Sequence, residues 1–173
     1  IMACNITAGR LEGCKDAVGG LNAIYFVNFS DMGTLTAVDE TITAISETTP
    51  SAFKYDLKGT STFEQSLTSS RDNGTTFAEQ TLTVSLKKQD STTHKEIKLL
   101  AYGRPHVIIE DNNGTLWLMG EEFGSEMNAT ASTGASLGDK SGYELTFSGM
   151  ERGFAKQFVG AAGIADFAVT LGV

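Results

Sequence analysis

The chain has 173 residues and carries 13 basic against 21 acidic side chains, a net charge of −8. This length suits one domain with a substantial core, and an apolar content of 40% excludes a disordered tail. The acidic balance argues against binding nucleic acid by neutralising its phosphates. Thr, Ser and Gly fill 54 positions and Pro only two, a composition typical of β-structure.

The cysteines and the apolar segments indicate in which cellular compartment the chain folds. Two cysteines, Cys4 and Cys14, are too few for a secreted disulfide scaffold and favour assembly in a reducing cytosol. Whether they pair is left open by the sequence. The first residues show neither the basic region nor the apolar region of a signal peptide, so no signal peptide is predicted. Residues 154–173 are the most apolar stretch, but Lys156 and Asp166 interrupt it, so we expect no membrane insertion.

The first predicted elements are strands. Residues 21–29 (LNAIYFVNF) are almost continuously apolar, as in a strand that is buried on both faces. The Thr-rich residues 34–50 fit either a short strand pair or an extended loop. Residues 53–58 alternate between apolar and charged side chains and predict a half-buried strand. Its core-facing side chains would be Phe53, Tyr55 and Leu57.

A long hairpin is predicted next. Residues 61–68 and 77–86 flank a loop that contains Asn73-Gly74, a pair that tolerates positive φ. One face of both arms is almost entirely polar, so we expect it to contact water or to line a hydrated channel. The candidates for lumen-facing positions are Thr62, Glu64, Ser66, Thr81, Thr83 and Ser85.

The remaining elements include one helix. Ile97, Leu100 and Ala101 fall at helical spacing, Asp90 or Ser91 can cap the N-terminus, and Gly103 follows, which predicts about ten helical residues within 91–102. A hairpin over 107–119, a Gly-rich loop over 133–142 and strands over 143–148 and 164–171 complete the chain. About eight strands and one helix predict a mainly β fold, a β-sandwich or partly closed β-barrel with one flanking α-helix, as a single domain over 1–173.

No pattern in the chain indicates catalysis. His94 and His106 have no Cys or carboxylate at ligand spacing, so each is interpreted as a surface histidine and no metal site is predicted. Nucleophile elbows, phosphate loops and dinucleotide fingerprints are absent. We therefore predict no enzyme, no catalytic residue and no cofactor.

Three charged patterns in the chain could indicate a function. Asp111, Asn113, Thr115 and Glu122 have calcium-loop spacing, but Leu116 stands where that loop needs glycine, so a hairpin turn explains them better. Two larger clusters are interpreted as a solvated turn and as a solvated helix face or subunit contact, respectively. The first comprises Glu121, Glu122 and Glu126, and the second comprises Lys87, Lys88, Lys95, Lys98 and Arg104.

Three passages, read in order, resemble the tail tube proteins of tailed bacteriophages. They are Phe53-x-Tyr55-x-Leu57-x-Gly59-Thr60-Ser61-Thr62-Phe63, Asn73-Gly74-Thr75-Thr76-Phe77-x-x-Gln80-x-Leu82-x-Val84-x-Leu86, and Gly142-Tyr143-x-Leu145-Thr146-Phe147-x-Gly149-x-Glu151. With the helix and hairpin between them, the resemblance covers roughly residues 21–151. It is a match of element order and style rather than of a diagnostic motif.

The resemblance implies a structural virion protein. Its family forms a β-sandwich with a flanking helix, and six copies make a ring whose inner β-barrel lines a channel; stacked rings form the tail tube that conducts double-stranded DNA during ejection. The implied assembly arms are the N-terminal segment 1–20 and the hairpin 61–86, with Arg71, Asp72, Asn73 and Gly74 between subunits.

The partners implied are copies of the chain itself, other tail proteins, and DNA in transit without sequence-specific binding. Assembly would take place in the host bacterial cytoplasm and the product would reside in the virion. The alternatives are a tail terminator or connector with the same fold, or an extracellular adhesin or carbohydrate-binding sandwich. A sugar binder would need exposed aromatic side chains, yet the only tryptophan, Trp117, falls on a predicted strand.

Overall fold

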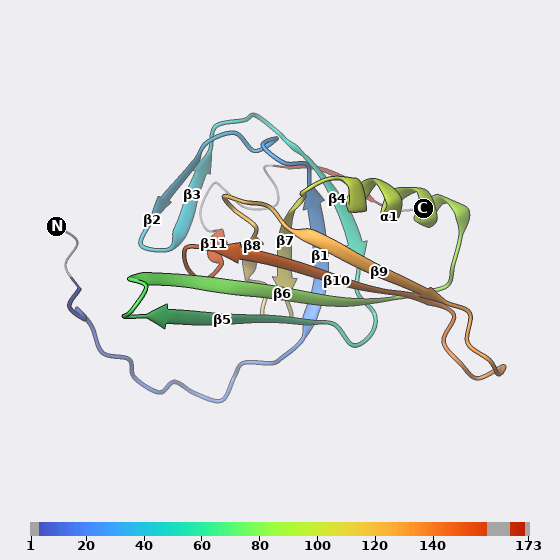
Figure 1. The fold of residues 1–173 in the computed structure, drawn as a ribbon, viewed down its shortest axis with the longest axis horizontal. Helices are drawn as coiled ribbons and strands as arrows, with labels where there is room; N and C mark the ends of the chain where they lie inside the picture. The colour runs from blue at the N-terminus through green and yellow to red at the C-terminus, as the bar shows by residue number, and fades with distance from the viewer. Residues whose placement is uncertain (1–3, 159–166, 172–173) are drawn as a thin grey trace.

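The computed structural model describes residues 4–158 and 167–171 as two β-sheets and one helix, α1 (Ser91–Tyr102) (Figure 1). Sheet A has the order β12 (Ala168–Leu171), β4 (Ser51–Asp56), β1 (Leu21–Val27), β7 (His106–Asp111), β8 (Leu116–Met119), β11 (Lys156–Phe158), β3 (Thr41–Ile45) and β2 (Leu35–Val38). Sheet B has the order β5 (Thr62–Ser70), β6 (Thr75–Lys87), β10 (Gly142–Glu151) and β9 (Glu126–Ser132). The predicted mainly β fold with one helix is confirmed, and within the described residues neither sheet closes into a barrel.

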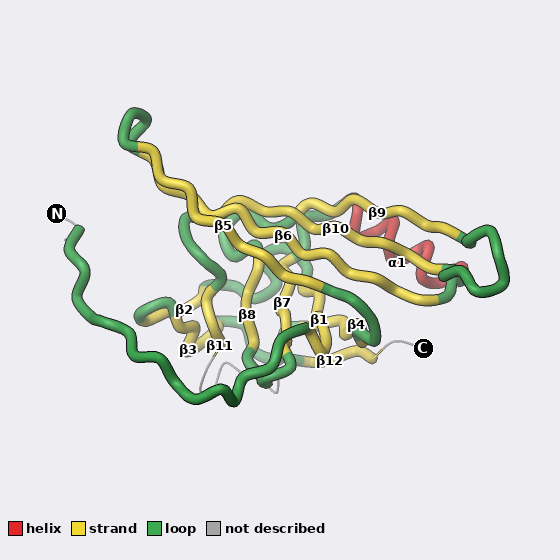
Figure 2. The backbone as a smooth tube through the Cα atoms, turned by 90° about the horizontal axis from the view of Figure 1, so that it is seen from below, coloured by secondary structure: helices red, strands yellow, loops and turns green. Residues whose placement is uncertain are grey.

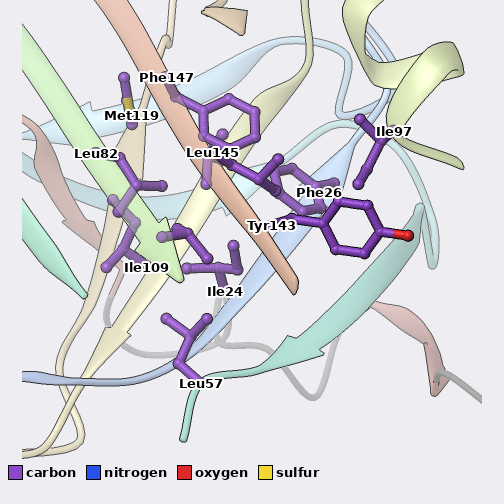
Figure 3. Close-up of a cluster of buried hydrophobic side chains, with 12 residues drawn as sticks. Ile24, Phe26, Leu57, Leu82, Ile97, Ile109, Met119, Tyr143, Leu145 and Phe147 are labelled. Atoms are coloured by element: carbon purple, nitrogen blue, oxygen red, sulfur yellow. The ribbon is translucent and has the colours of Figure 1, made fainter. Parts of the chain in front are cut away.

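The first core fills the space between the two sheets. Phe26 of β1 lies 4.9 Å from the ring of Tyr55 and 5.2 Å from that of Phe147, measured between ring centroids. Ile97 of α1 packs into the same cluster, so the helix closes one side of the sandwich (Figure 3). Full burial of an aliphatic or aromatic side chain contributes roughly 1.5–3 kcal/mol. The buried members are Ile24, Phe26, Leu57, Leu82, Val84, Ile97, Val107, Ile109, Met119, Tyr143, Leu145 and Phe147.

A second core covers the opposite face of sheet A. Because side chains alternate along a strand, β1 sends Ile24 and Phe26 to the first core but Ala23, Tyr25 and Val27 to the second. The prediction that this strand is buried on both faces is confirmed. The second core comprises Ala23, Tyr25, Val27, Met32, Ile42, Ala52, Ile108, Leu118, Phe158 and Phe167.

Two regions whose structure the sequence left partly open both form hairpins. The ambiguous residues 34–50 form the strand pair β2–β3, whose turn places Asp39 and Glu40 at positive φ. The predicted long hairpin is β5–β6, with strands that extend further than expected until only residues 71–74 remain in the turn. Gly74 has φ +65° there, a conformation that glycine adopts without steric cost.

Helix α1 forms as the sequence predicts. The Oδ1 atom of Asp90 accepts the backbone N–H of Thr93 at 2.6 Å, which satisfies one of the free donors of the first helical turn. This bond is the main reason that the pKa of the Asp90 carboxyl is lowered. The Tyr143 hydroxyl lies 3.2 Å from both the N and the O of Asp90 and so ties the helix start to β10.

Several expectations were wrong in detail. The described residues contain twelve strands rather than about eight: β2 and β3 form in the region that the sequence left ambiguous, and β9 and β11 lack a long apolar pattern. Phe53 is 39% exposed, so of the three side chains predicted to face the core only Tyr55 and Leu57 pack in the first core. The last strand begins at Ala168, and the part of its predicted range before residue 167 lies outside the described residues.

Candidate functional surface

The outward face of sheet B is the most unusual surface of the protein. Figure 2 shows this sheet as a separate layer that extends beyond sheet A at both ends. Directly paired residues of neighbouring antiparallel strands share a face, so the strand register defines rows across the sheet. One row is Glu64, Thr81, Ser148 and Glu126, and the next is Thr62, Thr83, Thr146 and Asn128. We call this surface the polar face.

All six candidate lumen positions lie on the polar face. Those of β5 are exposed and those of β6 are partly buried by their neighbours in the middle of the sheet, and none of them reaches either core. The residues are Thr62, Glu64, Ser66, Thr81, Thr83 and Ser85. The alternation that separates them from Leu82 and Val84 is therefore as the sequence predicts.

The polar face is anionic. Its outward positions carry Glu64, Glu79, Glu126 and Glu144, against one cation, Lys87, at the end of β6. Lys140 reaches in from the β9–β10 loop: its Nζ atom forms an ion pair with Glu144 and donates to Ser85 Oγ at 2.7 Å. Its hydrogen bond lowers the pKa of the Glu144 carboxyl. The two central rows carry no cation at all.

One end of the polar face is apolar instead. Phe77 of β6 and Met150 of β10 point outward and are 36% and 60% exposed. Phe123, from the β8–β9 loop, is 54% exposed and lines an open groove with Met150 and Glu79. Exposed apolar side chains that gather at one place mark a surface for contact with another molecule.

Both edges of sheet B are open. In the described part of the chain, β5 pairs only with β6, and β9 pairs only with β10. The two edge strands have nine and seven residues, and α1 contacts β9; an edge with which no further strand pairs is a template for strand addition. The sheet has four strands, all antiparallel, so its two edge strands run in opposite directions.

The predicted assembly arms occupy protruding positions. Arg71, Asp72, Asn73 and Gly74 form the exposed tip of the β5–β6 hairpin, where Ser70 Oγ accepts the N–H of Asn73 at 3.3 Å. Residues 4–17 form no strand or helix and extend away from the sandwich toward the N-terminus (Figures 1 and 2). Ile6 and Leu11 in this arm are 94% and 93% exposed, and Cys4 and Cys14 lie on it.

The arm is attached where it meets the body. Asn113 Oδ1 accepts the N–H of Val18 at 3.0 Å, and its Nδ2 donates to the carbonyl of Val18 at 2.9 Å. Asn112 donates its side-chain Nδ2–H to the carbonyl of Gly19 at 2.7 Å. The β7–β8 turn therefore fixes the base of the arm.

Sequence reasoning missed a buried polar node that joins the two sheets. Gln80 of β6 is 1% exposed; its Oε1 accepts the N–H of Gly120 at 3.2 Å, and its Nε2 lies 3.5 Å from Gln65 Oε1. Gln65 also accepts the N–H of Ala155 at 2.6 Å. A glutamine at a core-facing position of a strand was the only available signal, since its partner Gly120 comes from a distant loop.

His106 belongs to the same node, which corrects its interpretation as a surface residue. It is 4% exposed, its Nε2 accepts the N–H of Ser30 at 3.2 Å, and its Nδ1 donates to the carbonyl of Gly120 at 2.6 Å. The ring stacks on Phe29 at 5.1 Å between centroids. Burial lowers the pKa of His106, so the neutral form is held in place. His94, in contrast, is exposed as predicted.

The remaining acidic candidates have structural roles. Glu121 and Glu122 pair with Lys156 and Arg152 at 3.0 and 2.8 Å, while Glu126 starts β9 on the polar face. Glu151 is buried and accepts the backbone N–H groups of residues 122 and 123, and its desolvation raises the pKa of the carboxyl. Glu121, Glu122 and Glu151 are thus each engaged by a cation or by backbone N–H groups, whereas Glu126 lies on the polar face.

The calcium-like pattern is a hairpin turn. Asp111 Oδ1 accepts the N–H groups of Asn113 and Thr115 at 3.0 and 2.9 Å, and its Oδ2 accepts the Nε1–H of Trp117 at 3.2 Å. Among the described residues, no group of three or more His, Cys, Asp or Glu side chains is placed to hold a metal ion. In the same part of the chain, α1 is too short and too polar to cross a bilayer.

Comparisons with protein-family models, curated proteins and solved structures gave no match to this chain.

Proposed function

We propose that this protein is a structural subunit of a tailed-bacteriophage tail tube, in which copies of sheet B join edge to edge around a channel. The observation that carries the proposal is sheet B itself, a long antiparallel sheet with one polar, anionic face and two open edges. The core-facing side of the same sheet is buried against sheet A, so only the polar face is available to line a water-filled space.

The strand directions suit a closed ring. Because β5 and β9 run in opposite directions, β9 of one copy can pair with β5 of the next in the antiparallel sense. Such a contact joins unlike surfaces, and it repeats around a ring until it closes. Six copies give about 24 strands, above the roughly 16–18 at which barrels enclose an aqueous channel.

The charge of the polar face suits the passage of DNA. An anionic wall repels phosphates, so the duplex is not held by the counterion-releasing contacts that dominate DNA affinity. Ser and Thr hydroxyls between the carboxylates keep the wall hydrated. DNA would therefore slide through the channel rather than bind to it.

Negative-stain electron microscopy of the purified protein tests ring formation. We expect closed rings at high protein concentration, and Ala129→Lys on the exposed edge strand β9 should prevent them, because a lysine on an edge blocks strand addition. Ala135→Lys adds the same charge in the exposed β9–β10 loop and should leave rings intact. A protein that stays monomeric at every concentration and salt condition contradicts the proposal.

The lining role of the polar face needs its own test. The double substitution Glu64→Lys and Glu126→Lys reverses two charges in one row, and the resulting rings should bind double-stranded DNA in a salt-dependent manner. Glu12→Lys with Asp16→Lys makes the same change on the N-terminal arm and should bind DNA much more weakly. Equal DNA binding by the two variants would show that the polar face does not line the channel.

A terminator or connector role would use the same sheet without stacking. Rings that form but never associate further under any condition would favour that alternative. The carbohydrate-binding alternative gains no support from Trp117, whose ring packs against the first core and whose Nε1–H is bonded to Asp111.

A further inference from the structure

Charge is distributed unevenly along the long axis of the molecule. Residues 28–53, which include β2 and β3, contain four carboxylates and no lysine or arginine. Residues 86–105, which include α1, contain five basic and two acidic side chains in a chain whose net charge is −8. In both views the β2–β3 hairpin and α1 lie toward opposite ends of the strands of sheet B (Figures 1 and 2).

The outer face of α1 has no partner in the described part of the chain. Ile97 points into the core, while Leu99 and Tyr102 on the other side are 53% and 75% exposed. Lys95 and Lys98 are exposed beside them and take part in no ion pair with a described carboxylate; Lys98 Nζ lies 5.7 Å from the centre of the Tyr102 ring. This face combines an apolar centre with two free cations.

The β2–β3 hairpin offers the complementary surface. Val38 is 59% exposed, and Asp39 and Glu40 project from the turn next to it. Neither carboxylate forms an ion pair among the described residues. Asp31 and Glu47, from the flanking segments, are exposed as well. An apolar side chain beside several anions matches the composition of the helix face with the opposite charge.

We infer that the outer face of α1 docks against the β2–β3 hairpin of a second copy. The contact joins unlike surfaces at opposite ends of the molecule, so it can repeat from copy to copy as an open line when no rotation closes it. The β5 and β9 edges point sideways from the strand direction and stay free for the ring. This inference rests on the proposed function, because it assigns the contact that stacks one ring on the next.

Charge complementarity makes the contact sensitive to salt. Opposite charges at a solvent-exposed rim steer association and fix its register, and ions screen them over about 8–10 Å at 0.1–0.15 M salt. The buried apolar centre would supply the part of the affinity that salt does not remove.

The test measures stack length by electron microscopy and sedimentation. Lys95→Glu with Lys98→Glu should shorten stacks at least tenfold while single rings persist. Asp39→Lys with Glu40→Lys should do the same; lysine is tolerated at that backbone conformation, as Lys88 itself has φ 62°. Combining all four substitutions restores opposite charges and should restore the stacks. Lys58→Glu with Arg152→Glu, exposed and outside both surfaces and both predicted assembly arms, is the matched control.

The outcomes separate the two proposals. Stacks of unchanged length in the Lys95→Glu, Lys98→Glu variant, or no recovery in the fourfold variant, would overturn this contact and leave the ring untouched. Conversely, linear chains of single subunits that disappear in the same variant would support the contact and remove the ring.

Discussion

The two sheets of this protein differ in how many of their faces are covered. The central strands of sheet A are apolar on both sides, with one core against sheet B and a second on the far side. Sheet B is apolar on one side only, and its other side is a Ser, Thr and Glu surface. A sheet with both faces buried serves the fold of the subunit, whereas a long sheet with a bare polar face and open edges is available for assembly.

The largest difference in stability should appear when two neighbouring residues in one strand of sheet B are each replaced by alanine. Leu145→Ala deletes a fully buried side chain and should lower the free energy of unfolding by about 2–5 kcal/mol. Thr146→Ala, one residue along on the polar face, should change it by less than about 0.5 kcal/mol. Urea denaturation of the two variants measures the difference.

The same pair of alanine substitutions in sheet A should lower stability by similar amounts at both positions. Ile108 and Ile109 of β7 are neighbours that point to different cores, and both are fully buried. Each alanine substitution should therefore cost about 2–5 kcal/mol. A strongly unequal pair in β7, or an equal pair in β10, would contradict the distinction between the two sheets.

The polar node should give the next largest effect. Gln80→Leu keeps an apolar volume in the core but leaves the N–H of Gly120 without its acceptor, which should cost about 1–3 kcal/mol. Gln89→Leu, in the loop before α1, changes the same residue type outside the node and serves as the control. Equal stability of the two variants would mean that the node contributes nothing to the alignment of the sheets.

A smaller effect should appear in the pH dependence of stability. The folded state lowers the pKa of His106 below 6.5, so the unfolded chain takes up a proton first as the pH falls. The stability that neutral His106 contributes is fully present above pH 6.5 and is lost as the pH falls toward the lower pKa of the folded state. Urea midpoints between pH 5 and 8 should fall on the acid side.

Two variants assign this acid-side loss to one histidine. His106→Asn can still donate to Gly120 but cannot titrate, so its acid-side slope should be shallower than that of the wild type. His94→Asn, in the exposed helix face, should keep the wild-type slope. A slope that disappears in His94→Asn and stays in His106→Asn would refute the assignment.

The smallest effect concerns the arm. Asn113→Ala removes both hydrogen bonds to Val18 and should speed hydrogen exchange of the Val18 amide at least tenfold, while the urea midpoint barely changes. Asn128→Ala on the polar face should leave that exchange rate as it is. A large drop in global stability would instead mean that the arm belongs to the core structure.

Much of the fold was predictable where the signal is local. The buried strand β1, the β5–β6 hairpin around Asn73-Gly74 and the helix capped by Asp90 each depend on neighbours within a few residues. The polar face was predictable for the same reason, because polar and apolar side chains alternate at consecutive positions along β6. Strands β9 and β11 were not predicted. β9 is held mainly by its pairing with β10, and β11 has only three residues.

The role of single polar residues was less accessible. His106 sits next to Pro105 and was interpreted as exposed, yet Phe29 and Gly120 enclose it from distant positions. Gln80 likewise meets Gly120 only because β6 packs over the end of β8. Partners that are 14 to 76 residues away leave no periodic trace in the sequence.

The sequence by itself determined the alternation of each strand and the acidic, hydroxyl-rich character of one sheet face, because side-chain direction follows directly from residue parity. Only the tertiary structure decided that this face belongs to a four-stranded sheet with two open edges, and that the basic helix and the acidic hairpin lie at opposite ends. The physical reason is that strand order and edge exposure result from packing between distant segments, which local patterns do not encode.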